Sequence, residues 1–313
     1  MASPNRSLTL LAAIAALAVA GCSMQRLAVD RIGDALAADS AAYAGDDDPE
    51  MVGAAAPFGL KLMDSLLAES PRHRGLLLAA ARGYTQYAWA WVEQPADLAE
   101  ANDLAAAQAG RTRARKLYLR ARDYGIAGLA LGHPGFAAQL QADPAAAAAT
   151  VGPKDVALLY WTAAAWGAAI ALGKDDPALL AGLPQVEALA GRALELDEAW
   201  GSGSLHVLHI SLAMSRPGPV RAREAAARAH FERALVLSDG RQAAPYVTYA
   251  EAVGIPAGRA DAFAAALAQA LAIDPGATPE SRLANVLFQR RARWLSANAA
   301  QYFPLAAEKE AAR

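Results

Sequence analysis

The sequence is poor in three features that mark common protein classes. It has one cysteine in 313 residues, so no disulfide can form within one chain. Its net charge is only −2, which gives no strong attraction to nucleic acid. Aromatic and β-branched residues are sparse, the alternating pattern of strands is nearly absent, and alanine and leucine are abundant. We therefore expect an all-α protein.

Residues 1–21 have the features of a secretory signal. Arg6 supplies a positive start, and an apolar run follows from Leu8 to Val19. The run ends in Val-Ala-Gly before Cys22, which matches the bacterial lipobox, whose cysteine receives lipid. The alternative is an incidental cysteine after an ordinary signal. We predict that Cys22 is lipidated, which anchors the chain without a spanning helix and leaves no thiol for catalysis. Ser23 stands where an Asp would favour the inner membrane, so the outer membrane is favoured.

The stretch 153–174 is the element around which we expect the rest to pack. It has no charge between Asp155 and Lys174, which fits either a membrane span or a buried helix. Alanine, glycine, threonine and tyrosine dominate its middle, so transfer into lipid would gain little. We predict a fully buried helix that is capped by Asp155 and ends at Gly173.

Asp-Pro pairs recur and read as helix starts. In the acidic run 46–50, Asp48 precedes Pro49, and the same pair occurs at Asp143 and Asp176. The run lacks EF-hand spacing, so we interpret Asp48 as a cap rather than a Ca²⁺ ligand.

Other segments predict further helices. Leu27 to Ala42 suggests a first amphipathic helix, and a second carries aromatic residues from Leu76 to Val92. Between them we expect a helix that ends at Pro71. One face of this helix is formed by Phe58, Leu62, Ser65 and Leu66. The polar stretch 93–111 reads as an excursion between helices.

The stretch 111–125 is a basic amphipathic helix. Its arginines suit anionic lipid or RNA, or else form a solvated face. We favour the solvated face because the run is short and the net charge is negative.

A phrase repeats in the second half of the chain. It occurs at 193–198, 234–240 and 270–276, led by Ala193, Ala234 and Ala270, with a degenerate copy at 65–71. Tetratricopeptide repeats end in this way. Counting onward from Pro71, which closes the degenerate copy, places Leu77, Ala80 and Tyr84 at packing positions of the first helix of a repeat. The sequence thus predicts an α-solenoid of helix hairpins with degenerate tetratricopeptide-like repeats and a concave surface.

Aromatic side chains of two helical segments form the candidate ligand site. We expect some of them to line one cavity, although each is also suited to an ordinary core. Thr85, Gln86, Thr162 and Arg82 are nearby polar groups that could orient a small organic acid or a more apolar solute. The candidate ligand-binding residues are Tyr84, Tyr87, Trp89, Trp91, Tyr160, Trp161 and Trp166.

The sequence shows no catalytic, metal or cofactor motif. His206 and His209 share a helical face, but two histidines without further ligands do not make a metal site. The stretch 201–204, GSGS, is neither a phosphate loop nor a nucleophile elbow, and we interpret it as a turn that leads into a helix. We therefore expect a protein that is not an enzyme and needs no cofactor.

Five stretches carry a family resemblance: DDDPEMVGAAAPFGLKLMDSLL, GYTQYAWAWV, LYLRARDYGIAGL, DVALLYWTAAAWGAAIAL and RLANVLFQRRARWL. The chain resembles the TatT family, the T-components of tripartite ATP-independent periplasmic (TRAP) transporters. The resemblance implies a periplasmic lipoprotein with cryptic tetratricopeptide repeats. It also implies a homotrimer, a ligand-sized channel in each protomer, and docking of a periplasmic solute-binding subunit. No catalytic residue is carried over.

On this basis we divide the chain into four parts. These are a lipoprotein signal peptide (1–21), a tether with a first helix (22–48), a single helical-repeat domain (49–303) and a C-terminal tail (304–313). A tetratricopeptide scaffold in envelope assembly and an unrecognised enzyme remain the alternative functions.

Overall fold

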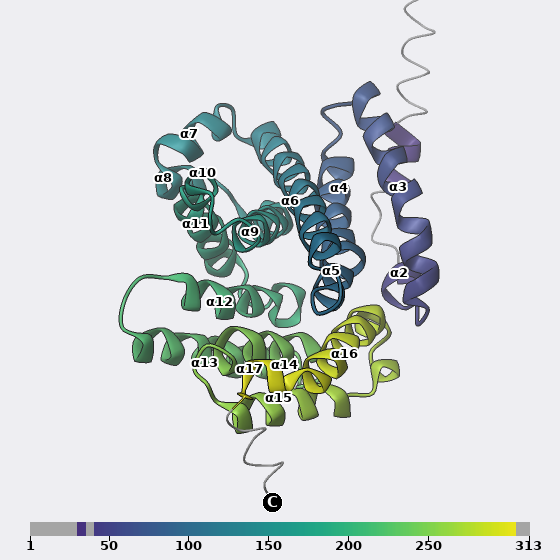
Figure 1. Ribbon diagram of the computed structural model, residues 1–313. Coiled ribbons are helices and arrows are strands. Elements are labelled where there is room, and N and C mark those ends of the chain that lie inside the picture. Colours follow the sequence, from purple (N-terminus) through teal and green to yellow (C-terminus); the bar gives the residue numbers. More distant parts are fainter. Residues whose placement is uncertain (1–29, 36–40, 305–313) are drawn as a thin grey trace, which may run out of the picture.

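The computed structural model describes residues 30–35 and 41–304, and within them every regular element is a helix (Figure 1). The all-α prediction is confirmed. The first half contains α2 (Ala41–Ala44), α3 (Pro49–Glu69), α4 (Arg74–Ala88), the π-helical turn η1 (Trp89–Glu93), α5 (Gln94–Ala99), α6 (Leu104–Gly132), α7 (Phe136–Ala142), α8 (Pro144–Ala149), the 3₁₀ turn η2 (Pro153–Asp155) and α9 (Val156–Ala171).

The second half continues the same pattern. It contains α10 (Pro177–Leu180), α11 (Leu183–Leu196), the 3₁₀ turn η3 (Trp200–Gly203), α12 (Ser204–Ser215), α13 (Val220–Leu237), α14 (Ala243–Tyr249), the π-helical turn η4 (Ala250–Gly254), α15 (Ala260–Ala272), the 3₁₀ turns η5 (Pro275–Ala277) and η6 (Pro279–Ser281), α16 (Arg282–Ala297) and α17 (Ala299–Tyr302). Helices close in sequence are packed together, as in α4 with α6, α12 with α13 and α15 with α16. This arrangement is compatible with the predicted solenoid of hairpins.

Helix α9 lies between α6 and α11 and contributes many side chains to the largest core cluster. Its small residues allow close approach: a Cβ at Gly125 of α6 would lie 2.0 Å from the hydroxyl of Thr162. The prediction of a fully buried helix is only partly right. Tyr160, Trp161 and Ala164 are half-buried, because they lie on a side of α9 that its neighbours do not cover completely.

The predicted Asp-Pro helix starts are confirmed. The carboxylate of Asp48 accepts a hydrogen bond from the backbone N–H of Met51 at 3.0 Å, and Asp143 and Asp176 cap α8 and α10 in the same manner. Each side chain satisfies a backbone N–H that the first helical turn leaves without a partner.

Asp155 does not act as predicted. It stands at the start of α9, but its side chain makes no capping hydrogen bond. It is 2% exposed and pairs instead with Arg74, and its other oxygen lies 3.3 Å from His133 Nε2. The burial of the carboxylate explains this choice, because a buried charge needs a charged partner more than a helix start needs a cap.

The repeat alanines occupy the predicted positions. Ala193, Ala234 and Ala270 lie near the ends of α11, α13 and α15, and all three are fully buried. At Gly203, in the predicted turn before α12, φ is +96° and a Cβ would lie 3.0 Å from the carbonyl oxygen of Ala234. A glycine at this turn therefore lets the start of α12 approach the backbone of α13 closely. Leu77, Ala80 and Tyr84 are also buried, as predicted.

Helix α3 corrects a second prediction. Phe58 is 76% exposed and Ser65 is exposed, whereas Leu60, Leu66 and Leu67 are buried. The predicted apolar face is therefore only half right: Leu66 is buried and Leu62 packs against the core, whereas Phe58 and Ser65 lie on an outer face, since α3 lies at the edge of the molecule (Figure 1). Among the described residues α3 is long and apolar enough to span a membrane, a property it shares with core helices of soluble proteins. The predicted first helix, 27–42, falls partly outside the described residues; residues 30–35 are helical.

Candidate functional site

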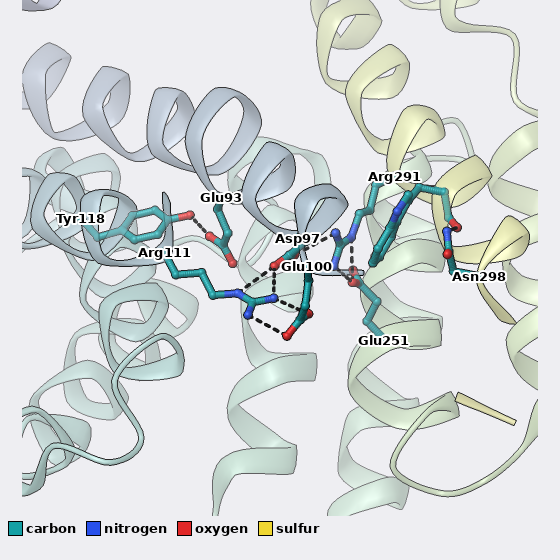
Figure 2. Close-up of polar contacts among 9 residues, drawn as sticks. Glu93, Asp97, Glu100, Arg111, Tyr118, Glu251, Arg291 and Asn298 are labelled. Atoms are coloured by element: carbon teal, nitrogen blue, oxygen red, sulfur yellow. Dashed lines mark hydrogen bonds and ion pairs between the residues drawn. The ribbon is translucent and has the colours of Figure 1, made fainter. Parts of the chain in front are cut away.

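The polar stretch 93–111 is helical, contrary to the prediction of an excursion. It begins with the last residue of the π-helical turn η1 and contains α5, the short turn 100–103 and the start of α6. A second π-helical turn, η4, extends α14 in the other half of the chain. Such turns are rare and are frequent at functional sites. Charged residues of α5, α6, η4 and α16 form one network, the interhelical charge network, and Glu93 of η1 lies beside it (Figure 2).

Arg111 of α6 holds one end of this network. Its guanidinium donates to Asp97 at 2.8 Å and to Glu100 at 2.6 Å and 2.9 Å. The Glu100 contact is bidentate, the geometry in which arginine–carboxylate pairs are strongest. The hydrogen bond to Glu100 is the main reason why the pKa of Arg111 lies above its ordinary value.

Arg291 of α16 continues the network across the molecule. It donates to Glu251 of η4 at 2.6 Å and 2.9 Å. Its Nη1 lies 2.9 Å from Asp97 Oδ2, an ion pair without hydrogen-bond geometry. The guanidinium also lies 4.5 Å from the ring centroid of Trp294, a favourable cation–π contact. Asp97 thus joins an arginine of the first half to an arginine of the second.

Glu93, the last residue of η1, has a different environment. It accepts a hydrogen bond from the hydroxyl of Tyr118, which is 1% exposed. Burial raises the pKa of Glu93 to about 7, against the lowering effect of the Tyr118 hydrogen bond, and the nearby Asp97 raises it further. Burial also raises the pKa of Glu251. Burial therefore favours the protonated form of Glu93.

Chemically, this network joins helices and carries no reactive nucleophile. Each of its arginines is bound by carboxylates. Two further contacts join α16 to the first half of the chain: Arg290 pairs with Glu50 of α3 at 2.6 Å, and the rings of Phe288 and Trp89 lie 4.4 Å apart. No group of three or more potential metal ligands occurs among residues 30–35 and 41–304.

The structure divides the predicted aromatic site among several places. The Tyr84 hydroxyl donates to Asp64 at 2.7 Å, and the Tyr124 hydroxyl donates to the other oxygen of Asp64 at 2.7 Å. Arg120 lies 5.3 Å from the Tyr84 ring centroid. Burial and the Asp64 hydrogen bond raise the pKa of Tyr84 to about 12. The polar end of Tyr84 is thus satisfied within the protein.

Three more of the predicted residues lie along η1 and the end of α4. Tyr87 and Trp91 are stacked with centroids 6.0 Å apart, and the Trp91 indole donates to the Pro49 carbonyl at 2.9 Å. Trp89 instead contacts Phe288 of α16. These three rings join α3, α4 and α16.

The residues of α9 form two further sets. Tyr160 contacts Trp161 and Trp200, with centroids 4.9 Å and 4.7 Å apart. Trp166 is 4% exposed and lies between Arg122 of α6 and Gly182, where a Cβ would approach the indole to 2.4 Å. Tyr160 and Trp161 are brought together in a half-buried position, whereas Trp166 is core.

The predicted solvated face of the basic stretch 111–125 carries ion pairs and ring contacts. Arg120 contacts Asp64, and Arg122 pairs with Asp123 at 2.7 Å and lies over Trp166. Arg113 lies 5.8 Å from the Tyr87 ring centroid. With Arg111 in the charge network, these cations are engaged within the chain.

His206 and His209 do share a side of α12, and both are buried. They meet His230 of α13: the Nδ1 atoms of His206 and His230 are 2.9 Å apart, and the rings of His209 and His230 are stacked. Burial lowers the pKa of all three, that of His230 to about 4. Burial therefore favours the neutral form of these rings, which pack α12 on α13.

Sequence reasoning missed the interhelical charge network. A signal was present: Glu93, Asp97 and Glu100 are spaced by four and three residues, which places three carboxylates on one side of a helix. Their partners Arg111 and Arg291 cannot be assigned from spacing, because Arg291 is distant in the chain.

Comparison with known proteins identifies the relatives of this chain. Residues 45–303 match the model of the family described as TRAP transporter T-component. An uncharacterized protein of Treponema pallidum (strain Nichols) is 30% identical over 321 residues, which cover 97% of this chain and 99% of that protein. The chain therefore belongs to the TRAP transporter T-component family, whose members are accessory subunits in transport.

Proposed function

We propose that this protein is a lipid-anchored periplasmic subunit that binds the solute-binding protein of a TRAP transport system. Family membership over residues 45–303 carries the proposal. An all-helical chain of packed hairpins is suited to protein partners, because stacked helix pairs offer an extended surface. The lipobox ending at Cys22, which lies outside the described residues, supports the lipid anchor.

Self-association as a homotrimer is the second part of the proposal. Its main support is the family resemblance. The outer face of α3 is consistent with it, because Met51 and Phe58 are 65% and 76% exposed on the same helix. Exposed apolar residues that gather on one face are a frequent sign of a protein interface.

Passive binding of a small organic acid or an apolar solute is the third part. Of the seven predicted residues, Trp161 is the strongest candidate, since it is half-buried and contacts a second candidate, Tyr160. Tyr160 is more enclosed, because it also contacts Trp200 and its hydroxyl is hydrogen-bonded with Ser204. Tyr84, Trp89, Trp91 and Trp166 already make specific contacts within the fold. No bond is made or broken in this proposal.

Affinity capture of the native lipoprotein tests the proposal. The tagged protein is extracted in mild detergent from cells that produce it at native level, and co-purified proteins are identified by mass spectrometry. Recovery of a TRAP solute-binding protein in a stoichiometric ratio supports the proposal. Recovery of envelope-assembly proteins without it favours the scaffold function instead. The same sample, analysed for small molecules, identifies the solute.

A further inference from the structure

Residues 30–35 are held on the turn between α3 and α4. The Ser70 hydroxyl donates to Asp30 Oδ1 at 2.8 Å. His73 Nδ1 accepts from the backbone N–H of Leu76 at 3.1 Å, so Nε2 carries the proton and donates to the Asp30 carbonyl, 3.2 Å away. Gly33 is buried, and a Cβ there would lie 2.9 Å from His73 and Leu76. These contacts fix the position of residues 30–35 against the α3–α4 turn.

The tether that remains is short. Cys22 is only eight residues before Asp30, so even a fully extended tether reaches roughly 28 Å. Helix α4, η1 and α5 run without a break from Arg74 to Ala99, which is about 39 Å of helix. A lipid at Cys22 is therefore within reach of the α3–α4 turn and out of reach of the far end of α5, where Asp97 pairs with Arg291 of α16.

We propose that the end of the molecule formed by residues 30–35 and the α3–α4 turn rests on the bilayer surface. Figure 1 shows this end opposite α13, α14 and α15. Those helices then point away from the membrane, into the space where a soluble partner is found. The proposal rests on lipidation of Cys22, which belongs to the proposed function.

The tether, rather than charge, sets this orientation. Exposed cations at this end, Arg31, Arg72 and Lys154, are accompanied by the exposed acids Asp34 and Glu69. The near balance gives little attraction to anionic lipid, since such attraction grows with each unpaired basic residue. Ile32, half exposed beside these charges, adds apolar surface. The orientation should therefore be the same on zwitterionic and anionic bilayers.

Site-specific quenching tests the proposal. Cys22 is the single cysteine, so in acylated protein an engineered cysteine is the one free thiol. The variants R72C, at the proposed membrane end, and A265C, on the exposed side of α15, each receive a fluorophore. Both are reconstituted as full-length lipoproteins in phosphatidylcholine vesicles with nitroxide-headgroup lipid, with or without phosphatidylglycerol.

We expect at least threefold stronger quenching at position 72 than at position 265 in both vesicle types. Inserting about 20 Gly/Ser residues after Gln25 should remove most of this difference, because a flexible linker lets the protein reorient. Equal quenching of the two labels in acylated protein overturns the orientation alone. A mass spectrum that shows unmodified Cys22 overturns the orientation together with the lipid anchor.

Discussion

Replacing Glu93 by glutamine should make the protein more stable at high pH and leave it little changed at low pH. Burial raises the pKa of Glu93 from its ordinary 4.5 to about 7, so the folded state holds this proton more tightly than the unfolded state. The stabilisation is complete below the unfolded pKa and is lost as the pH rises through the folded pKa. Glutamine still accepts the Tyr118 hydrogen bond through its carbonyl oxygen.

The magnitude follows from the pKa difference. A tenfold change in proton affinity corresponds to about 1.4 kcal/mol. The free energy of unfolding of the wild type, relative to Glu93→Gln, should therefore fall by at most about 3 kcal/mol between roughly pH 4 and pH 8. It is an upper bound because part of the Glu93 side chain reaches solvent. Urea unfolding followed by circular dichroism measures the difference at each pH.

Glu100→Gln is the matched control. Glu100 is bound by the same Arg111 network, but the Arg111 hydrogen bond lowers its pKa. Its contribution is present at high pH and lost on acidification, so this variant should lose stability relative to the wild type as the pH rises. A Glu93→Gln difference that does not depend on pH, or that has the sign expected for Glu100→Gln, would refute the reasoning.

Four further predictions concern the anchor, the core, the outer face of α3 and the ligand. Cys22→Ala should leave the protein soluble in the periplasm or unprocessed, and unchanged membrane fractionation of this variant would contradict lipidation. Trp166→Ala should lower the free energy of unfolding by about 3–5 kcal/mol. Ala165→Asp, at a fully buried position, should lower it more than Ala164→Asp, at a half-buried one. Equal losses for the two aspartate variants would argue against the observed packing of α9. Phe58→Ser should weaken self-association, measured as a lower mass in light scattering, whereas Val236→Ser should not, although Val236 of α13 is similarly exposed. An unchanged mass for Phe58→Ser would contradict a role of α3 in the interface. Trp161→Ala should weaken solute binding at unchanged stability, whereas Tyr84→Ala should lower stability because Asp64 loses a partner; a loss of stability in Trp161→Ala that keeps step with its loss of binding is evidence against a ligand site.

Local signals predicted local structure well. The Asp-Pro pairs at Asp48, Asp143 and Asp176 mark helix starts because the cap and the helix it serves are adjacent in sequence. The repeated alanines were predicted for the same reason: each stands near the end of its own helix, and all three are buried.

Contacts between distant segments could not be predicted in this way. Asp155 has the sequence position of a cap, but Arg74 and His133 determine its role. Phe58 lies in an apolar pattern that normally marks a buried face, yet α3 is at the edge of the molecule and no described element covers that side. The charge network depends on Arg291, almost two hundred residues after Asp97. In each case the partner is set by tertiary structure, which spacing does not encode.

Direct titration of the purified lipid-free protein with the purified solute-binding protein of a TRAP system from the same organism tests the central claim. Isothermal titration calorimetry gives the affinity and the stoichiometry. We predict saturable binding with a Kd of roughly 1 μM or tighter, about 8 kcal/mol, and one solute-binding protein per protomer. No heat and no complex at about 100 μM of each protein would contradict the proposed role in TRAP transport.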